Sequence, residues 1–447
     1  MQVNETLSDG LKRGLKIVLE VRELDERFTA RLDAVKDRVQ LKGFRPGKVP
    51  VAHIKRIYGR SLMAEVLQIA VEETSRQALT DRKERPAFQP KIVFPEDKTE
   101  IERVIDGKAD FTYGMEFEVL PEIKIADLAG LKLERVVADV DEASIDRAVG
   151  DLVERNVSYE ADPDRAAEAT DQVTVDFVGR IDGVEFEGGK GEAVPVVIGR
   201  GGFIPGFEEG LTGVKAGETR LVTAAFPTEY AKAELAGKPA AFEVTVKEVA
   251  RAKRPEVDDA FAKTLGAENV AELRKLVSAQ IKREFDALSR AKLKRSLLDE
   301  LERAHDFALP PSLVDGEYES IWNQATGALK QSGKTFEDEG KTEESAKAEY
   351  RKLAERRVRL GLVIGEIGNQ SKVQVSQDEM RGALIEQARR FPGQEKMVYE
   401  FYEKTPGAVA ELRAPIFEDK VIDHIVGLAK PVERKVSREE LFKFDPE

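Results

Sequence analysis

The sequence of 447 residues contains no cysteine and only three histidines. A chain without cysteine can form neither a disulfide framework nor a thiolate site. The histidines, His53, His305 and His424, are scattered and lack the spacing of metal ligands, so we expect them on the surface or on helix faces. The sequence therefore predicts no metal site, and we expect no bound cofactor.

Long apolar runs are also absent. No stretch approaches the 18 apolar residues of a membrane-spanning helix, so we expect no membrane partner. Residues 1–24 have charges spread among their apolar positions, unlike a signal peptide, which indicates a cytoplasmic protein. At about 150 residues per domain, the length predicts roughly three domains.

The net charge of −13 argues against a general nucleic-acid binder. The charge is uneven, however, because residues 36–60 contain eight basic residues and one acidic residue, Asp37. A cationic patch on an anionic protein indicates a docking site for an anionic surface at one end of the chain.

The periodicity of apolar residues divides the chain into four segments and predicts an elongated, multidomain α+β protein. Residues 1–110 read as an α/β docking domain, with a strand over 14–21 and helices over 24–41 and 51–79. Residues 111–164 form a connector that we expect to pack with the C-terminal domain. The third segment, residues 165–250, predicts a small antiparallel sheet with a short helix near 207–211.

Residues 251–447 predict a helical domain with long arms. A capping box from Ser376 to Glu379 marks the start of one of its helices. Its apolar positions could form a sealed core or an exposed cradle. The helices are expected over residues 269–304, 313–331, 342–368 and 376–390.

The loop GFRPGKVP at residues 43–50 lies between two predicted helices. Its glycines and prolines suit an ordinary helix connection. It is not a phosphate-binding loop, since it is one residue short between the glycines and no Ser or Thr follows Lys48. Phe44 beside Arg45 at a loop tip is instead typical of an interface hot spot.

Three motifs make the chain resemble a known family. The GFR-x-GK-x-P loop is similar to the ribosome-docking signature of bacterial trigger factors. VTVDFVGRIDGVEFEGG with IGRGGFIPGFEEGLTGVKAGE resembles their FKBP-type prolyl isomerase module, and FALPPSLVDGEYE resembles their helical substrate-binding domain. The order and size of the segments match as well, so the resemblance covers essentially the whole chain.

The resemblance implies an ATP-independent chaperone at the tunnel exit of the large ribosomal subunit. Its partners would be a ribosomal protein, nearby ribosomal RNA, and nascent and unfolded polypeptides; a weak homodimer off the ribosome is left open. Pro46 stands where some relatives have a cation, which leaves fewer positive contacts. By the match, the docking residues are Gly43, Phe44, Arg45, Gly47, Lys48 and Pro50.

The resemblance also implies a peptidyl-prolyl cis-trans isomerase with an aromatic pocket. Rotation about a prolyl bond needs a site that binds the twisted amide and requires no nucleophile. Phe203 and Val194 are expected at the edges of this pocket, and Asp176 beside it. The matching catalytic positions are Phe177, Phe186, Glu187, Ile204, Phe207, Tyr230 and Phe242. Alternatively, these aromatic residues are simply the core of a small sheet.

Three other functions remain open from the residues alone. The chain could be a free cytosolic prolyl isomerase or holdase that does not dock on the ribosome. It could be an RNA-binding or assembly factor that uses the basic arm, although its net charge argues against this. The isomerase pocket could also be vestigial and serve as a second surface for binding unfolded chains.

Overall fold

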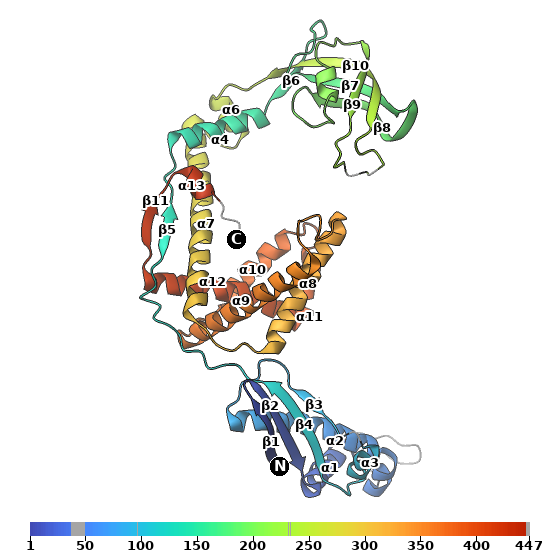
Figure 1. The fold of residues 1–447 in the computed structure, drawn as a ribbon, viewed down its shortest axis with the longest axis vertical. Coiled ribbons are helices and arrows are strands. Elements are labelled where there is room, and N and C mark those ends of the chain that lie inside the picture. The colour runs from blue at the N-terminus through green and yellow to red at the C-terminus, as the bar shows by residue number, and fades with distance from the viewer. Residues whose placement is uncertain (37–49, 96, 231, 233, 444–447) are drawn as a thin grey trace. The chain divides into compact units, whose positions relative to one another are not determined.

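The computed structural model describes residues 1–36, 50–95, 97–230, 232 and 234–443. These residues form two compact units (Figure 1). The first unit combines residues 1–135 with residues 292–433, and the second combines residues 136–291 with the segment that begins at residue 434. Within the described ranges, no helix is both long and apolar enough to cross a membrane.

The N-terminal part of the first unit is a four-stranded antiparallel sheet with three helices. The strand order is β1-β2-β4-β3. Alternate residues of β2 are buried, so one face of the sheet packs against the helices. The strand predicted at 14–21 is confirmed as β2, while β1 and α3 were not predicted. The elements are β1 Gln2–Asp9, β2 Lys12–Leu19, α1 Val21–Lys36, α2 Val51–Arg82, β3 Lys91–Val93, α3 Lys98–Ile105 and β4 Phe111–Glu118.

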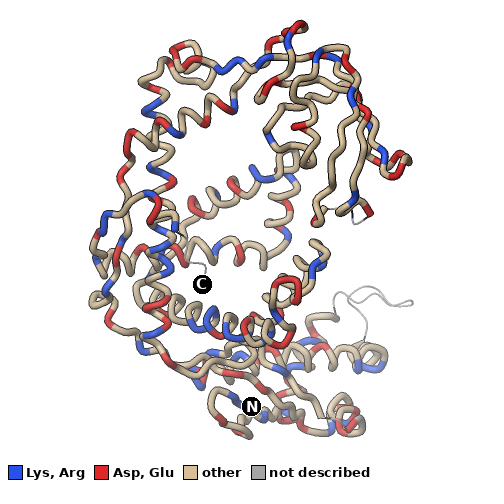
Figure 2. Tube along the Cα trace, turned by 45° about the horizontal axis from the view of Figure 1, so that its top comes forward, with Lys and Arg blue, Asp and Glu red and all other residues tan. Residues whose placement is uncertain are grey.

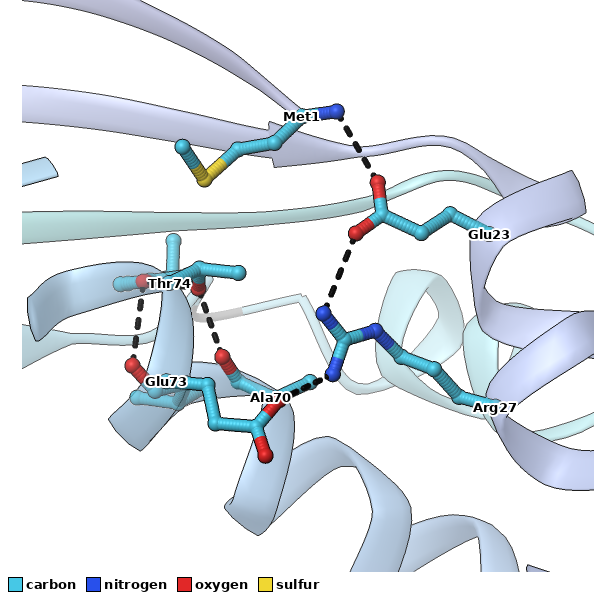
Figure 3. Close-up of polar contacts among 8 residues, drawn as sticks. Met1, Glu23, Arg27, Ala70, Glu73 and Thr74 are labelled. Carbon is cyan, nitrogen blue, oxygen red and sulfur yellow. Dashed lines mark hydrogen bonds and ion pairs between the residues drawn. The ribbon is translucent and has the colours of Figure 1, made fainter. Parts of the chain in front are cut away.

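Ionic contacts join the two helices on either side of residues 37–49. Glu23 in α1 accepts a hydrogen bond from the α-amino group of Met1 at 2.9 Å and pairs with Arg27 at 3.3 Å (Figure 3). Arg27 also reaches Glu73 of α2 at 2.5 Å. These contacts fasten α1 to the middle of the long helix α2.

The remainder of the first unit is helical. Its main core combines leucines of α7 with aliphatic side chains of α9 and α12. The predicted helices are confirmed, and so is the capping box, in which Ser376 and Glu379 cap each other at the start of α10. The helices are α7 Val270–Ala304, of which only the residues from 292 onward belong to this unit, α8 Pro311–Ser332, α9 Glu343–Gln370, α10 Gln377–Arg389, α11 Glu395–Lys404 and α12 Pro406–Ala429.

Charges of both signs are interspersed along the chain (Figure 2). Arg356 of α9, for example, pairs with both Asp299 and Glu302 of α7. Ion pairs of this kind explain how a chain with 35% charged residues forms long amphipathic helices that pack against one another.

His305 differs from its predicted position. It is 3% exposed and therefore buried, not on the surface. Its Nδ1 lies 2.7 Å from the carbonyl oxygen of Leu301, and its Nε2 accepts a hydrogen bond from the backbone amide of Ala126 at 3.1 Å. The prediction was wrong because the connector covers this position, a contact that helical periodicity cannot reveal.

The second unit contains a five-stranded antiparallel sheet in the order β6-β10-β7-β8, with β9 paired to β10. This sheet and its short helix α5 confirm the prediction for residues 165–250. The elements are α4 Glu142–Arg155, β6 Ser158–Ala161, β7 Gln172–Ile181, β8 Val184–Val197, α5 Phe207–Gly210, β9 Thr219–Ala225, β10 Pro239–Lys253, α6 Asp259–Thr264 and α13 Arg438–Phe442. A further strand pair joins β5, Glu134–Val137, to β11, Val432–Lys435.

Candidate functional site

A cavity of about 450 Å³ opens beside the five-stranded sheet of the second unit. Its lining is mainly aromatic and aliphatic, with glycines, prolines and two charged residues, Glu187 and Lys232. The structure places all seven of the predicted catalytic residues around this cavity, namely Phe177, Phe186, Glu187, Ile204, Phe207, Tyr230 and Phe242. Phe203, expected at the edge, lines it too.

Phe207, at the start of α5, forms the floor and is 1% exposed. Its ring meets those of Phe242 and Phe177 edge-on, with centroid distances of 5.1 and 5.6 Å. Phe203 stacks on it at 5.2 Å with an interplanar angle of 19°. Edge-on and offset-stacked rings are the favoured arrangements of aromatic pairs, so the four rings at the floor of the cavity form a well-packed aromatic cluster.

Glycines in the strands let these rings approach the backbone closely. A Cβ at Gly179 of β7 would lie 2.5 Å from Cε1 of Phe242, and a Cβ at Gly191 of β8 would lie 2.6 Å from Cε1 of Phe177. Any larger residue at either position would displace an aromatic wall. The glycine-rich composition of this segment therefore shapes the cavity as well as its turns.

The loop that leads into α5 forms another wall and is held by a buried carboxylate. Glu208 is 4% exposed, and it accepts hydrogen bonds from the amides of Gly201, Gly202 and Phe203 at 2.9, 2.7 and 3.0 Å. Burial by itself raises the pKa of the Glu208 carboxyl. The hydrogen bonds from Gly201, Phe203 and Gly202 outweigh burial, and that pKa lies below its ordinary value.

The rim carries the polar groups of the site. Tyr230 is 38% exposed, and its ring packs against Phe226 with the centroids 4.7 Å apart. The Nζ of Lys232 lies 3.5 Å from the backbone carbonyl oxygen of Glu187. A substrate that enters the apolar cavity would therefore pass charged and hydroxyl groups at its mouth.

Sequence reasoning missed several lining residues, including Phe226, Pro227, Lys232 and Leu235. Phe226 could have been found, because it continues the inward alternation of Val222 and Ala224 in β9. The others lie in the segment after β9, where no periodic pattern indicates which side chains turn inward.

Two neighbouring predictions are placed outside the cavity. Val194, expected at an edge, packs partly buried against the core of the sheet and does not line the cavity. Asp176 accepts a hydrogen bond from the amide of Ala193 at 2.7 Å and pairs with Lys247 at 2.9 Å. The hydrogen bonds from Ala193 and Lys247 lower the pKa of Asp176, which takes no part in the cavity.

Most of the predicted docking residues, Gly43, Phe44, Arg45, Gly47 and Lys48, lie outside the described residues. Pro50 is described and caps the N-terminus of α2 with φ −60° and ψ 135°. The first turns of α2 then expose Lys55, Arg56 and Ile57. Within the described ranges, no three His, Cys, Asp or Glu side chains are grouped so that they could hold a metal ion.

Comparison with family models gives three consecutive matches. Residues 1–152 match the bacterial trigger factor protein, and residues 269–427 match the C-terminus of that protein. Residues 163–247, which include every residue that lines the cavity, match the FKBP-type peptidyl-prolyl cis-trans isomerase model.

Curated relatives align along nearly the full chain. The trigger factor of Methylocella silvestris is 50% identical over 99% of this chain and 96% of its own length. The trigger factor of Rhodopseudomonas palustris is 50% identical over 100% of this chain and 98% of its own length. The trigger factor of Methylobacterium radiotolerans is 49% identical over 99% of this chain and 94% of its own length.

One solved structure, described as promiscuous substrate recognition in folding and assembly activities of the trigger factor chaperone, shares the fold. It aligns with a TM-score of 0.53 and 21% identity, over 96% of this chain and 99% of the solved chain. The family models and the identity of the relatives over their full length agree. The chain therefore belongs to the trigger factor family of chaperones, which combine a ribosome-docking N-terminal domain with an FKBP-type peptidyl-prolyl cis-trans isomerase domain.

Proposed function

We propose that the aromatic cavity of the second unit is the isomerase site and that the seven residues named above act in it. This proposal rests on one observation: all seven predicted catalytic residues line the same cavity. The barrier to rotation about a prolyl bond, about 18–20 kcal/mol, arises from lost amide resonance. An apolar pocket that binds the twisted amide more tightly than the planar one lowers this barrier.

Each of the seven residues has a role that depends on where it lies in the cavity. Phe207 forms the base on which the proline ring rests, and Phe177 and Phe242 hold that base from the sides. Phe186 and Ile204 complete the apolar walls, while Tyr230 and Glu187 at the rim orient the peptide backbone. Water is excluded from the twisting amide by these aromatic walls, so the charge-separated planar amide is no longer favoured by solvent.

We further propose that residues 43–50 dock the chain at the tunnel exit of the large ribosomal subunit, where they contact a ribosomal protein and ribosomal RNA. The support is the match of the GFRPGKVP sequence to the family signature and the exposed cations that follow it, Lys55 and Arg56. Cationic contacts with phosphates release counterions, so this binding should weaken as salt rises.

The helical part of the first unit is proposed to hold nascent and unfolded chains in the cytoplasm without ATP. Large apolar side chains on and between α10 and α11 are exposed beside charged residues, among them Phe391 at 46%, Met397 at 60% and Phe401 at 54%. Shallow apolar patches among charges suit weak, reversible binding of unfolded segments.

Co-sedimentation with vacant bacterial ribosomes across a salt series tests the docking proposal. The parent chain should pellet with ribosomes at low salt and dissociate as salt rises. A Phe44/Arg45/Lys48→Ala triple variant should stay in the supernatant, while the control variant Lys91→Ala, on the short strand β3, should behave as the parent. Equal binding by the parent and the triple variant would mean that another surface docks, and no binding by either would favour a free isomerase. Sedimentation velocity over a concentration series would decide whether the chain forms a weak homodimer off the ribosome.

A further inference from the structure

Glu208 of α5 directly follows Phe207, a residue that lines the isomerase cavity, but does not line the cavity itself. Its carboxylate is buried, and among the described residues no lysine, arginine or histidine forms an ion pair with it. Its two oxygens instead accept hydrogen bonds from the three consecutive backbone amides of Gly201, Gly202 and Phe203. A buried charge is costly unless it is compensated, and here the backbone of one loop supplies the compensation.

The three amides belong to the segment that forms a wall of the cavity. Gly199 and Gly201 both have positive φ, +82° and +74°, so the loop contains conformations that only its glycines adopt readily. Such a loop has many alternative conformations, and fixing it costs conformational entropy. The charge-assisted hydrogen bonds to Glu208 offset that cost at the point where the loop turns toward α5.

The placement of the wall follows from these bonds. The amide of Phe203 is bound to Glu208 at 3.0 Å, while the ring of Phe203 stacks on the floor residue Phe207 at 5.2 Å. Ile204, the next residue, lines the cavity. Glu208 directly follows Phe207 in α5, so one short helix carries both the floor and the group that fixes the wall.

We propose that Glu208 is a positioning residue of the isomerase, whose carboxylate holds the backbone of residues 201–203 and so places Phe203 and Ile204 against the substrate proline. This inference rests on the isomerase function proposed for the cavity. The carboxylate does not itself contact the reacting amide. It acts only through the loop.

The test compares the full-length chain with its Glu208→Gln variant on a short Xaa-Pro peptide. The amide of Gln has one acceptor oxygen and presents an N–H₂ group to the backbone donors, so the loop should loosen. We expect kcat/KM to fall about tenfold or more, with a rise in KM. Partial unfolding would only reduce the amount of active enzyme and leave KM unchanged, so the rise in KM separates positioning from stability.

Two further variants complete the design. Glu218→Gln is the matched control, because Glu218 accepts a hydrogen bond from the amide of Lys215 at 3.0 Å but does not line the cavity. It should keep the parent KM. Glu208→Asp keeps the charge on a shorter side chain and carries the test if Glu208→Gln does not fold; it should give an intermediate KM.

Amide hydrogen exchange provides a second readout. In Glu208→Gln, the amides of Gly201, Gly202 and Phe203 should exchange faster, while those of the central strand β7 keep the parent rates. Parent values of KM and unchanged exchange at these three amides would overturn the inference. A parent chain with no isomerase activity would instead overturn the function proposed for the cavity, which is a distinct result.

Discussion

The Nε2 of His305 accepts a hydrogen bond from the backbone amide of Ala126, at 3.1 Å and across 179 positions of the sequence. Because the amide must donate, Nε2 is the acceptor and the proton of the neutral ring lies on Nδ1, which donates to the carbonyl of Leu301 at 2.7 Å. The imidazole thus ties the segment after β4 to the end of α7 within the first unit.

Replacing His305 by alanine should destabilise the first unit. The half-buried amide of Ala126 would lose its acceptor and the buried imidazole would lose its packing, so we expect a loss of about 1–3 kcal/mol. Chemical denaturation followed by circular dichroism would measure the loss. The exposed residue His424 provides the control, since His424→Ala should change the free energy of unfolding by less than about 0.5 kcal/mol. Equal stability of both variants would contradict the structural role of His305.

Tyr230 offers a test of the cavity that separates activity from stability. Because its side chain is 38% exposed, Tyr230→Ala should cost little free energy of unfolding. The loss of this aromatic side chain, worth about 0.5–1.5 kcal/mol, should lower kcat/KM by a factor of about 2–13. A peptide isomerisation assay checks this, with Leu221→Ala, 69% exposed on the same module, as the control. Unchanged activity of the Tyr230 variant would remove this residue from the site.

Two glycines should respond to alanine with opposite signs. At Gly179 a Cβ would lie 2.5 Å from the Phe242 ring, so Gly179→Ala should destabilise the module by about 1–3 kcal/mol and reduce isomerase activity. At Gly150, inside α4, no atom lies within 4 Å of an added Cβ, and Gly150→Ala should stabilise by about 0.5–1 kcal/mol. Thermal unfolding of both variants measures the difference, and a Gly179→Ala variant as stable as the parent would refute the close packing at Gly179.

Glu379 should titrate far below the ordinary pKa of a glutamate. Hydrogen bonds from Lys420, and then from the amide and hydroxyl of Ser376, lower the pKa of Glu379 to about 2. Because the folded pKa is depressed, the stabilising contribution is complete above the ordinary value of about 4.3 and is lost as pH falls toward 2. The contact between α10 and α12 should therefore weaken in acid.

An NMR titration of the Glu379 carboxyl carbon measures this pKa directly. The Lys420→Gln variant removes the charged donor that lowers the pKa of Glu379 most, so this pKa should rise toward its ordinary value. Arg381, on the same helix but paired with Asp378, provides the control substitution Arg381→Gln, which should leave the Glu379 titration unchanged. The same low pKa in the Lys420 variant would assign the shift to the helix cap alone.

Local features of the sequence were sufficient for much of this description. Ser376 and Glu379 predicted a helix start because a capping box involves residues three apart, and the structure has that cap. Alternation of apolar residues predicted the strands of the second unit in the same way. The aromatic positions around the cavity were predicted by resemblance to a family, and their shared placement is a property of the folded sheet.

What the sequence by itself determined is most of the helices and strands and the glycine-rich character of the isomerase module, since these depend on neighbours a few residues apart. Tertiary structure alone decided that His305 is buried, that Phe226 joins the cavity and that Glu208 binds the loop before α5. Each of these depends on which segments come together when the chain folds. Periodicity cannot report this, because it records the faces of one element and not the surface that covers them.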